Sequence, residues 1–172
     1  MANKEALREL QSRLAERLLA ARTQDLGKSW LAVECCGHGF LLPLKDAGEI
    51  FTAAPIVPVP HAQAWFLGVA NLRGHLHGVV DLAGFVGLTS AEPLRDQSHL
   101  VVFNPSLEIN CALLVDRLAG LRTEQQLALH TAPDGETPAF VGERYRDEGG
   151  RIWQELRLAT LANDEAFLRV VR

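Results

Sequence analysis

The sequence predicts a mainly β protein whose short strands form small barrels or a sandwich. Three observations support this fold class. Short apolar runs alternate with turn residues along most of the chain, prolines interrupt several runs, and two pairs of runs are joined by tight turns. With 172 residues and 48% hydrophobic content, the chain can form one ordinary domain or two small, tightly joined ones.

Charge and composition narrow the class of protein. The formal net charge is −4, and Lys and Arg are scattered rather than clustered, so we expect no nucleic-acid partner. The N-terminus has no apolar leader and no window is long enough to span a bilayer, which indicates a cytoplasmic protein without direct membrane insertion. Three cysteines, an odd number, fit reduced and buried side chains better than a disulfide framework.

The first element that we expect is an amphipathic helix. It ends before Gly27, so residues 1–27 form the helix segment and residues 28–172 form the main domain. A heptad continued along its apolar stripe would meet Arg17, which disfavours a coiled coil and favours a helix that folds back onto its own domain. The apolar positions recur at three- and four-residue spacing: Leu7, Leu10, Leu14 and Leu18.

Strands follow from residue 29 onward. Alternating residues 31–35, a turn at 37–39 and the run at 40–42 predict a first hairpin. The segment AAPIVPVP at 53–60 is too rich in proline for a helix or a central strand, so we expect an extended connection along a sheet edge. Residues 99–116 predict a second hairpin around Pro105 and Ser106.

The pattern is weaker after residue 121. It predicts a short helix at 123–127, a strand near 153–158 and a last helix at 164–170. GVVDLAGFVGL and ALLVDRLAGL also resemble each other, since each is an apolar strand that ends in Asp and precedes a turn or helix with Leu-Ala-Gly. We interpret this similarity as a sign of two similar subdomains.

The segment WFLGVANLRGHLHGVVDLAGFVGL contains a hairpin with a charged tip. Residues 65–70 are apolar on both faces, and Gly68 leaves room for a closely packed neighbour. Residues 71–74 form the turn, where Gly74 is suited to a positive φ. Asp81 ends the return strand and can cap a short helix over residues 82–86.

Arg73 therefore lies at the tip of a rigid hairpin. A solvated turn arginine is one interpretation. The other is recognition of a protein surface, because a guanidinium on a stiff support presents several donors in a fixed geometry.

At these residues the chain resembles the CheW family. LGVANLRGHLHGVVDLAGFVGL matches the family's hallmark turn, KDAGEI and LLVDRLAGL match segments on either side, and residues 29–121 are covered. The resemblance implies two five-stranded SH3-like barrels packed together, with a groove between them. It also implies a scaffold without enzymatic activity that joins the cytoplasmic tip of a chemoreceptor to the regulatory domain of a CheA-type histidine kinase.

The resemblance also assigns a receptor-facing groove. Its residues fall on Ala47, Glu49 and Arg73, and Asn71 belongs to the same hallmark turn. The N-terminal helix, WQEL and the ending AFLRVV are most similar to the family's adaptors for type IV pilus systems, which implies control of twitching motility. The chain departs from the family at Gly78, where proline is usual, and in its C-terminal half, which lacks a second Asp-Leu segment.

Other classes of function are weaker. Cys35, Cys36 and His38 lie close in sequence, and His75 and His77 share a strand face, but no second ligand pair has the spacing of a zinc site. Nucleotide loops and a nucleophile elbow are also missing from the sequence, so we expect no metal, no cofactor and no catalytic residues. The alternative from another class is a regulatory β-barrel domain that binds a small molecule.

Overall fold

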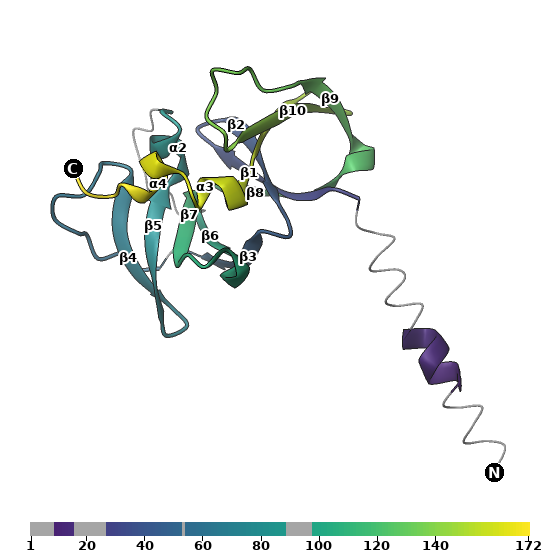
Figure 1. Ribbon diagram of the computed structural model, residues 1–172, viewed down its shortest axis with the longest axis horizontal. Helices are drawn as coiled ribbons and strands as arrows, with labels where there is room; N and C mark the ends of the chain where they lie inside the picture. The colour runs from purple at the N-terminus through teal and green to yellow at the C-terminus, as the bar shows by residue number, and fades with distance from the viewer. Residues whose placement is uncertain (1–8, 16–26, 53, 89–97) are drawn as a thin grey trace, which may run out of the picture.

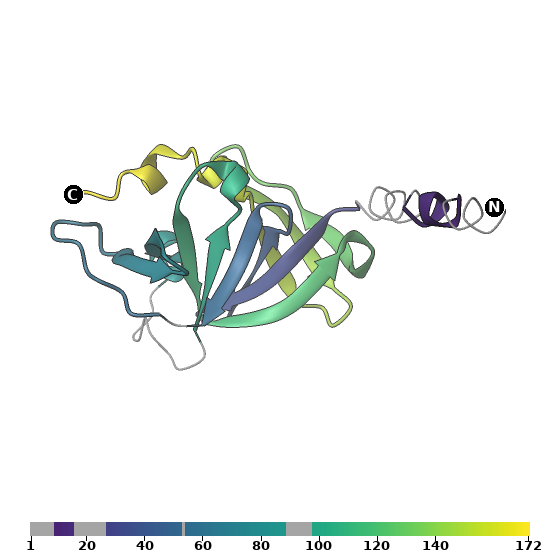
Figure 2. The ribbon, with the colours of Figure 1, turned by 90° about the horizontal axis from the view of Figure 1, so that it is seen from below.

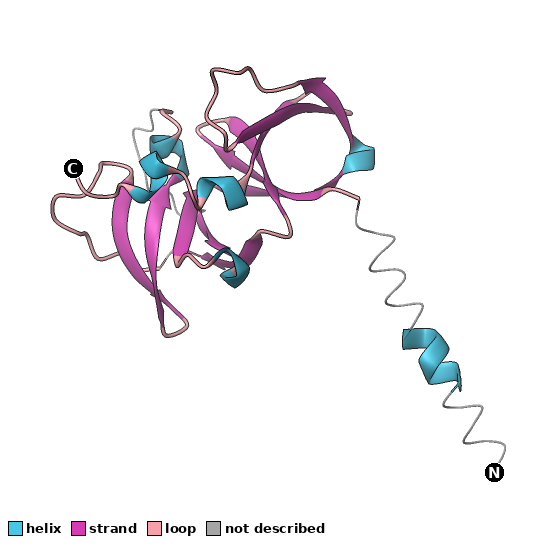
Figure 3. Ribbon diagram, viewed as in Figure 1, coloured by secondary structure: helices cyan, strands magenta, loops and turns pink. Residues whose placement is uncertain are grey.

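The computed structural model describes residues 9–15, 27–52, 54–88 and 98–172. Over these residues the protein is mainly β, with a few short helices at the ends of strands (Figure 3). The strands form two sheets, each curled into a small barrel, and the barrels lie side by side (Figure 1). This arrangement confirms the predicted fold class. Within the described residues, no helix has the length and apolar composition needed to cross a bilayer.

The first barrel contains the first and the last strands of the chain. Its strand order is β8-β1-β2-β11-β10-β9. The chain begins this barrel with one hairpin, leaves to build the whole second barrel, and then returns to complete it. The strands are β1 (Ser29–Cys35), β2 (His38–Pro43), β8 (Arg117–Thr123), β9 (Leu127–Thr131), β10 (Val141–Asp147) and β11 (Ile152–Leu156).

The second barrel is formed by the middle of the chain. Its strand order is β3-β6-β7-β5-β4. The β6–β7 hairpin turns through a short 3₁₀ helix, η1 (Pro105–Leu107), which confirms the hairpin predicted at residues 99–116. The strands are β3 (Ala47–Thr52), β4 (Phe66–Leu72), β5 (His75–Asp81), β6 (His99–Phe103) and β7 (Cys111–Val115).

The two barrels share one plan of strand pairing. In the first, the β1–β2 hairpin pairs in parallel with β11 of the β11–β10 hairpin. In the second, the β6–β7 hairpin pairs in parallel with β5 of the β5–β4 hairpin. A four-residue helix follows each of the two corresponding strands: α2 (Leu82–Phe85) after β5 and α3 (Leu158–Leu161) after β11.

The pairing plan shows that the two similar sequence segments are not structural counterparts. The segment ALLVDRLAGL forms β7 and then β8, so no helix follows its Asp116. The structural counterpart of β5 and α2 is instead β11 and α3, where Arg157 occupies the position of Asp81. The two segments differ in sequence because a shared pairing pattern requires similar apolar positions but not the same turn residues.

Each barrel is closed by one ribbon of chain that pairs with both edges of its sheet. In the first barrel β8 pairs with β1, the 3₁₀ helix η2 (Glu124–Gln126) turns the chain, and β9 pairs with β10. This turn divides the ribbon into two strands, so the first sheet has six strands rather than the five expected. In the second barrel β3 pairs with β6, and Val57 in the following segment bonds to Val69 of β4.

The proline-rich segment can make only part of that closure. The Val57 N–H donates to the Val69 carbonyl at 2.8 Å, and the Val69 N–H donates back at 2.9 Å. Prolines nearby have no N–H to donate, so the pairing remains a single bridge. An extended connection along a sheet edge was expected here, and this part of the prediction is confirmed.

Most of the buried apolar residues lie between the barrels rather than inside either one. The shared core combines residues of β1 and β2 with residues of β5, β6 and β7. Leu158 and Leu161 of α3, and Phe167 of the C-terminal helix α4 (Glu165–Leu168), complete it. Each barrel also has a smaller interior cluster, and Trp30 and Trp153 fill that of the first. The barrels are therefore held together by a shared apolar core and not only by the connections between them.

The three cysteines are free thiols with different surroundings. Cys35 and Cys111 are buried in the shared core, and burial raises the pKa of each to about 12. Cys36 is only half-buried, because it lies in the two-residue turn between β1 and β2 with φ of 50°. The expectation of three buried cysteines is thus wrong for Cys36.

The chain end returns to the second barrel. The C-terminal residues, in yellow, run along one side of that barrel (Figure 2). The Gln63 N–H donates to the Val170 carbonyl at 2.7 Å, and the Arg172 N–H donates to the His61 carbonyl at 2.9 Å. These bonds tie the C-terminus to the loop that precedes β4.

The N-terminal helix does not pack on a barrel over its described part. Residues 9–15 are helical, and every one of them is exposed, including Leu10 and Leu14. Figure 1 shows this stretch, in purple, away from both barrels. The expectation that the helix folds back onto its domain is therefore wrong for residues 9–15, and the other residues of the predicted helix lie outside the described part. Leu10 and Leu14 are therefore accessible to a partner.

A charged network links β1, β8 and the residue before β11 in the first barrel. Glu34 of β1 accepts bonds from Arg151 and, at 2.6 Å, from Arg117 of β8. The Arg151 guanidinium also lies over the Trp153 ring, 4.6 Å from its centroid. Burial acts to raise the pKa of Glu34, but the hydrogen bonds and charges of the two arginines outweigh it and lower that pKa.

We predict that replacing Gly68 opens the second barrel. An added Cβ would lie 2.1 Å from the Val57 carbonyl oxygen, and φ at Gly68 is +136°. Because backbone atoms cannot move aside cheaply, Gly68→Ala should cost roughly 2 to 4 kcal/mol of unfolding free energy. Urea unfolding measures the loss, and Gly135→Ala is the control, since nothing lies within 4 Å of a Cβ there. Equal stability of the two variants would contradict the closure described above.

A second prediction concerns pH. A carboxylate with a lowered folded-state pKa contributes stability above its unfolded pKa, and this contribution is lost as the pH falls through the folded pKa. Glu34→Gln should therefore cost about 1 to 2 kcal/mol at pH 7, and the difference from the parent protein should shrink below about pH 4.5. Urea unfolding across pH checks this, with the exposed Glu136→Gln as control. A difference that stays constant down to pH 3 would contradict it.

Candidate partner-binding groove

The tip of the β4–β5 hairpin is a two-residue loop. Leu72 pairs with His75, so the loop consists of Arg73 and Gly74, with φ values of 51° and 84°. Two successive positive φ angles define the turn type whose twist matches that of the flanking strands. The Asn71 side chain fixes this loop, since its Oδ1 accepts the Gly74 N–H at 2.8 Å.

Arg73 extends from this loop toward β3. Its Nη1 donates to Glu49 Oε1 at 2.9 Å, and its guanidinium lies 5.6 Å from the centroid of the Phe51 ring. The two charged side chains are 74% and 57% exposed, so water screens the pair and its net contribution to stability is small. Both side chains are held in place and remain accessible to a partner.

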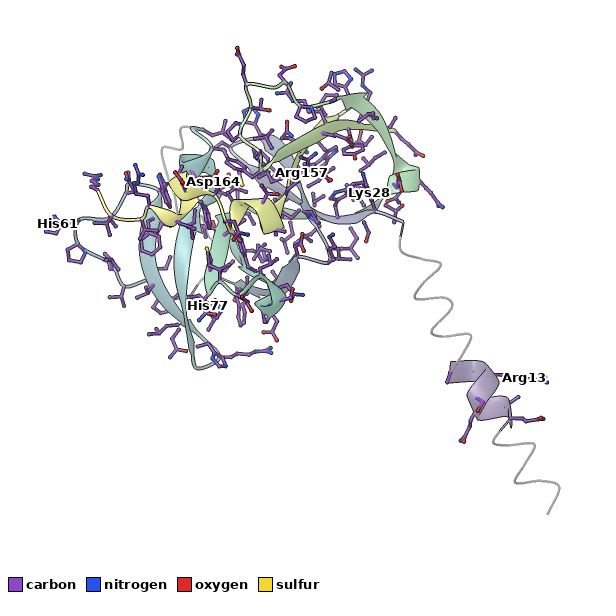
Figure 4. All side chains as sticks on the ribbon, in the orientation of Figure 1. Arg13, Lys28, His61, His77, Arg157 and Asp164 are labelled. Carbon is purple, nitrogen blue, oxygen red and sulfur yellow. The ribbon has the colours of Figure 1, made fainter. Side chains whose placement is uncertain are left out.

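A groove of about 600 Å³ runs beside this ion pair. Its apolar floor includes Phe51, Leu72 and Val102, and the ion pair lies at its rim. Two histidines of β5 complete the lining on the hairpin side, and Figure 4 labels one of them, His77, above the turn. The lining residues are Glu49, Phe51, Leu72, Arg73, His75, His77, Val102, Phe103, Pro105 and Asn110.

Ala47 lies apart from this groove. The pairing of β3 with β6 shifts between Ala47 and Ile50, which marks a bulge. The shift turns Ala47 toward the shared core, where it is half-buried and pairs with Phe103, while Glu49 lines the groove. Of the four residues that the sequence assigned to partner binding, the structure thus brings three to the hairpin tip and its ion pair.

The three residues assigned structural roles lie as follows. Gly68 meets the Val57 backbone, as described above, and Gly74 forms half of the loop. Asp81 occupies the N-cap position of α2, but its side chain makes no capping hydrogen bond of ordinary geometry. Burial raises the pKa of Asp81, although the nearby backbone N–H groups of Gly84 and Ala83 act in the opposite direction.

Eight of the ten lining residues were not assigned to the groove in the sequence analysis, and the strand pattern could have identified three of them. Phe51 lies two residues beyond Glu49 on the same strand, and His75 and His77 follow Arg73 at the same spacing of two. Side chains two residues apart in a strand share a face. The period of a strand, applied outward from Glu49 and Arg73, was therefore the available signal.

The groove is suited to recognition of an amphipathic segment. Its floor offers apolar surface, while the Arg73 guanidinium offers several N–H donors in a fixed plane and Glu49 offers a carboxylate. Because Glu49 lies on β3 and Arg73 follows β4 in the same barrel, the barrel fixes the spacing of their backbones. A helix with apolar residues on one face and charged residues beside them matches this surface.

Comparison with known proteins identifies the class to which this fold and groove belong. Residues 29–166 match the CheW-like domain family. Because the match covers most of the chain, the protein belongs to this family of scaffold and adaptor proteins.

The chain is similar to individual members of this family to different extents. The chain is 34% identical over 156 residues to Protein PilI of Pseudomonas aeruginosa, covering 86% of this chain and 83% of that protein. It is 30% identical over 108 residues to the chemotaxis protein CheW of Rhizobium meliloti, covering 63% of this chain and 68% of that protein. The crystal structure of the scaffolding protein TtCheW from Thermoanaerobacter tengcongensis has the same fold, with a TM-score of 0.66 at 19% identity, over 77% of this chain and 90% of that chain.

The contacts at the tip predict different effects of two substitutions on stability. Asn71→Ala removes the acceptor of the Gly74 N–H and should lower the free energy of unfolding by about 1 kcal/mol. Arg73→Ala removes only an exposed ion pair and an exposed ring contact, so the change should be no more than about 0.5 kcal/mol. Thermal melts of both variants measure this, and a larger loss for Arg73→Ala would show that Arg73 supports the fold.

Proposed function

We propose that this protein is a cytoplasmic adaptor that couples a chemoreceptor to a CheA-type histidine kinase, without catalysing a reaction itself. Membership of the CheW-like family supports the adaptor role. Its similarity to PilI supports a place in a chemosensory system that controls type IV pili and twitching motility. The single observation that carries the proposal is the accessible ion pair of Arg73 and Glu49 at the rim of an apolar groove.

The groove receives a helix from the cytoplasmic tip of the chemoreceptor. Apolar side chains of that helix cover the half-buried Phe51, which lies beside the buried Leu72 and Val102, and this contact removes apolar area from water. Arg73 donates to carboxylates or carbonyls on the helix, which fixes its register and orientation. The rigid loop limits the entropy lost on binding, because the backbone of Arg73 is already held by the turn.

The kinase regulatory domain binds a surface outside this groove. An adaptor must hold both partners at once, and a receptor helix in the groove excludes any other occupant. We also infer that residues 28–172 form the unit that binds both partners, while residues 1–27 form a separate helical segment. The family match, which begins at residue 29, supports this division.

Receptor affinity of Arg73 variants tests the proposal. Arg73→Ala should weaken binding of a receptor-tip helical hairpin by about five- to several-hundred-fold, the range for a truncated interface arginine. Arg73→Lys should also lose affinity, because an ammonium cannot replace a planar fork of donors. Isothermal titration of each variant measures the loss, and thermal melts confirm that each is folded.

Arg146→Ala is the matched control, since Arg146 is an exposed strand arginine of the other barrel. Its affinity for the receptor tip should equal that of the parent protein. Equal losses for Arg146→Ala and Arg73→Ala would mean that overall charge governs binding and would refute the groove. Recovery of the receptor tip with the kinase regulatory domain in a pull-down, only when this protein is present, tests the coupling itself.

A further inference from the structure

Over its described residues, 9–15, the exposed N-terminal helix has an apolar face without a partner in the described structure. Leu10 is 57% exposed and Leu14 is 53% exposed, although both are large apolar side chains. They lie four residues apart, so in a helix they are neighbours on one face. Two adjacent leucines on an exposed helix resemble the anchors with which amphipathic helices enter apolar grooves.

Charged residues flank these leucines in a pattern that matches the groove. Glu9 and Arg13 are also four residues apart, and each immediately precedes one of the leucines. They form a line of opposite charges along one side of the apolar face. The rim of the groove holds the complementary pair, Arg73 and Glu49, beside its apolar floor.

We propose that the N-terminal helix docks in the groove of its own chain and competes there with the receptor helix. Leu10 and Leu14 cover the apolar floor, Arg13 meets Glu49, and Glu9 meets Arg73. In the structure the described part of the helix lies away from the barrels, and Figure 4 labels Arg13 on it. The competition rests on the proposed function of the groove, whereas the docking itself does not.

The connection is long enough for docking within one chain. The Leu44 N–H donates to the Ser29 carbonyl at 3.0 Å, so the start of β1 lies beside the chain that leads into β3. Glu49 is five residues beyond Leu44, at most about 18 Å along an extended chain. A segment as long as the one between residues 15 and 29 spans about 20 Å even as a helix, and more when extended.

The exchange of ion-pair partners costs little. Arg73 and Glu49 are both mostly exposed, so separating them and pairing each with a helix residue replaces one screened contact with two. The favourable change comes from covering the two exposed leucines together with the half-buried Phe51. Docking therefore needs no rearrangement of either barrel.

The test uses the full-length chain with the apolar face reversed. In Leu10→Glu/Leu14→Glu the helix can no longer enter the groove, so the receptor tip should bind about 3- to 10-fold more tightly. This range follows if the groove of the parent protein is docked for roughly 70 to 90% of the time. The matched control is Ser12→Glu/Ala15→Glu, which adds the same charge on sides of the helix turned away from the leucines. The control should bind like the parent protein.

A second measurement is independent of any receptor. The ring resonances of His75 and His77 should shift between the parent protein and Leu10→Glu/Leu14→Glu, but not in the control variant. Unchanged resonances in the leucine variant would overturn the proposal. Shifts that grow with protein concentration would also overturn it, since they assign the groove to the helix of a second copy. If the receptor does not bind the groove at all, the histidine resonances still decide whether the helix does.

Discussion

Closure of each barrel depends on a single ribbon that must pair with both edges of a curled sheet. In the first barrel the turn at Glu124–Gln126 lets the ribbon continue as two strands. In the second the ribbon is rich in proline, and the closure narrows to two hydrogen bonds between Val57 and Val69. Gly68 makes those bonds possible, because any side chain there would occupy the space of the Val57 carbonyl. The position of β4, and with it the hairpin tip, follows from this one close approach of two backbones.

Closure of the second barrel also makes the groove rigid. Its two charged residues come from strands at opposite edges of the second sheet, β3 and the end of β4, and they meet only because the barrel is closed. Arg73 also adopts a positive φ that Gly, Asn and Asp accept more readily than Arg does. The loop therefore holds a residue type that its backbone conformation disfavours. Such a mismatch is typical of a position selected for recognition and not for folding.

Much of this architecture could be predicted from local patterns. The alternation of apolar and polar residues predicted the hairpins at residues 31–42 and 99–116. The sequence around Asn71 and Arg73 indicated the family and the hairpin tip. The differences between the sequence predictions and the structure concern contacts between distant segments. The bulge that turns Ala47 inward depends on the pairing of β3 with β6. The structural counterpart of α2 is identified by the order of the strands and not by sequence similarity. Likewise, the amphipathic pattern of residues 9–15 shows that one helix face is apolar, but it does not specify what covers that face.

The insertion of one barrel into the other determines the order in which the molecule can be completed. The β1–β2 hairpin is synthesised early, but its partner β11 comes last among the strands. The hydrogen bond from Trp30 to Glu155 therefore joins residues that are 125 positions apart in the sequence. The second barrel, by contrast, lies within one continuous stretch of chain and has its strands available long before the ribosome has finished. During synthesis, the β1–β2 hairpin therefore has an unpaired edge while the second barrel is already nearly complete. The shared core gives that hairpin an apolar surface to rest on, so the second barrel can act as a template on which the first is assembled.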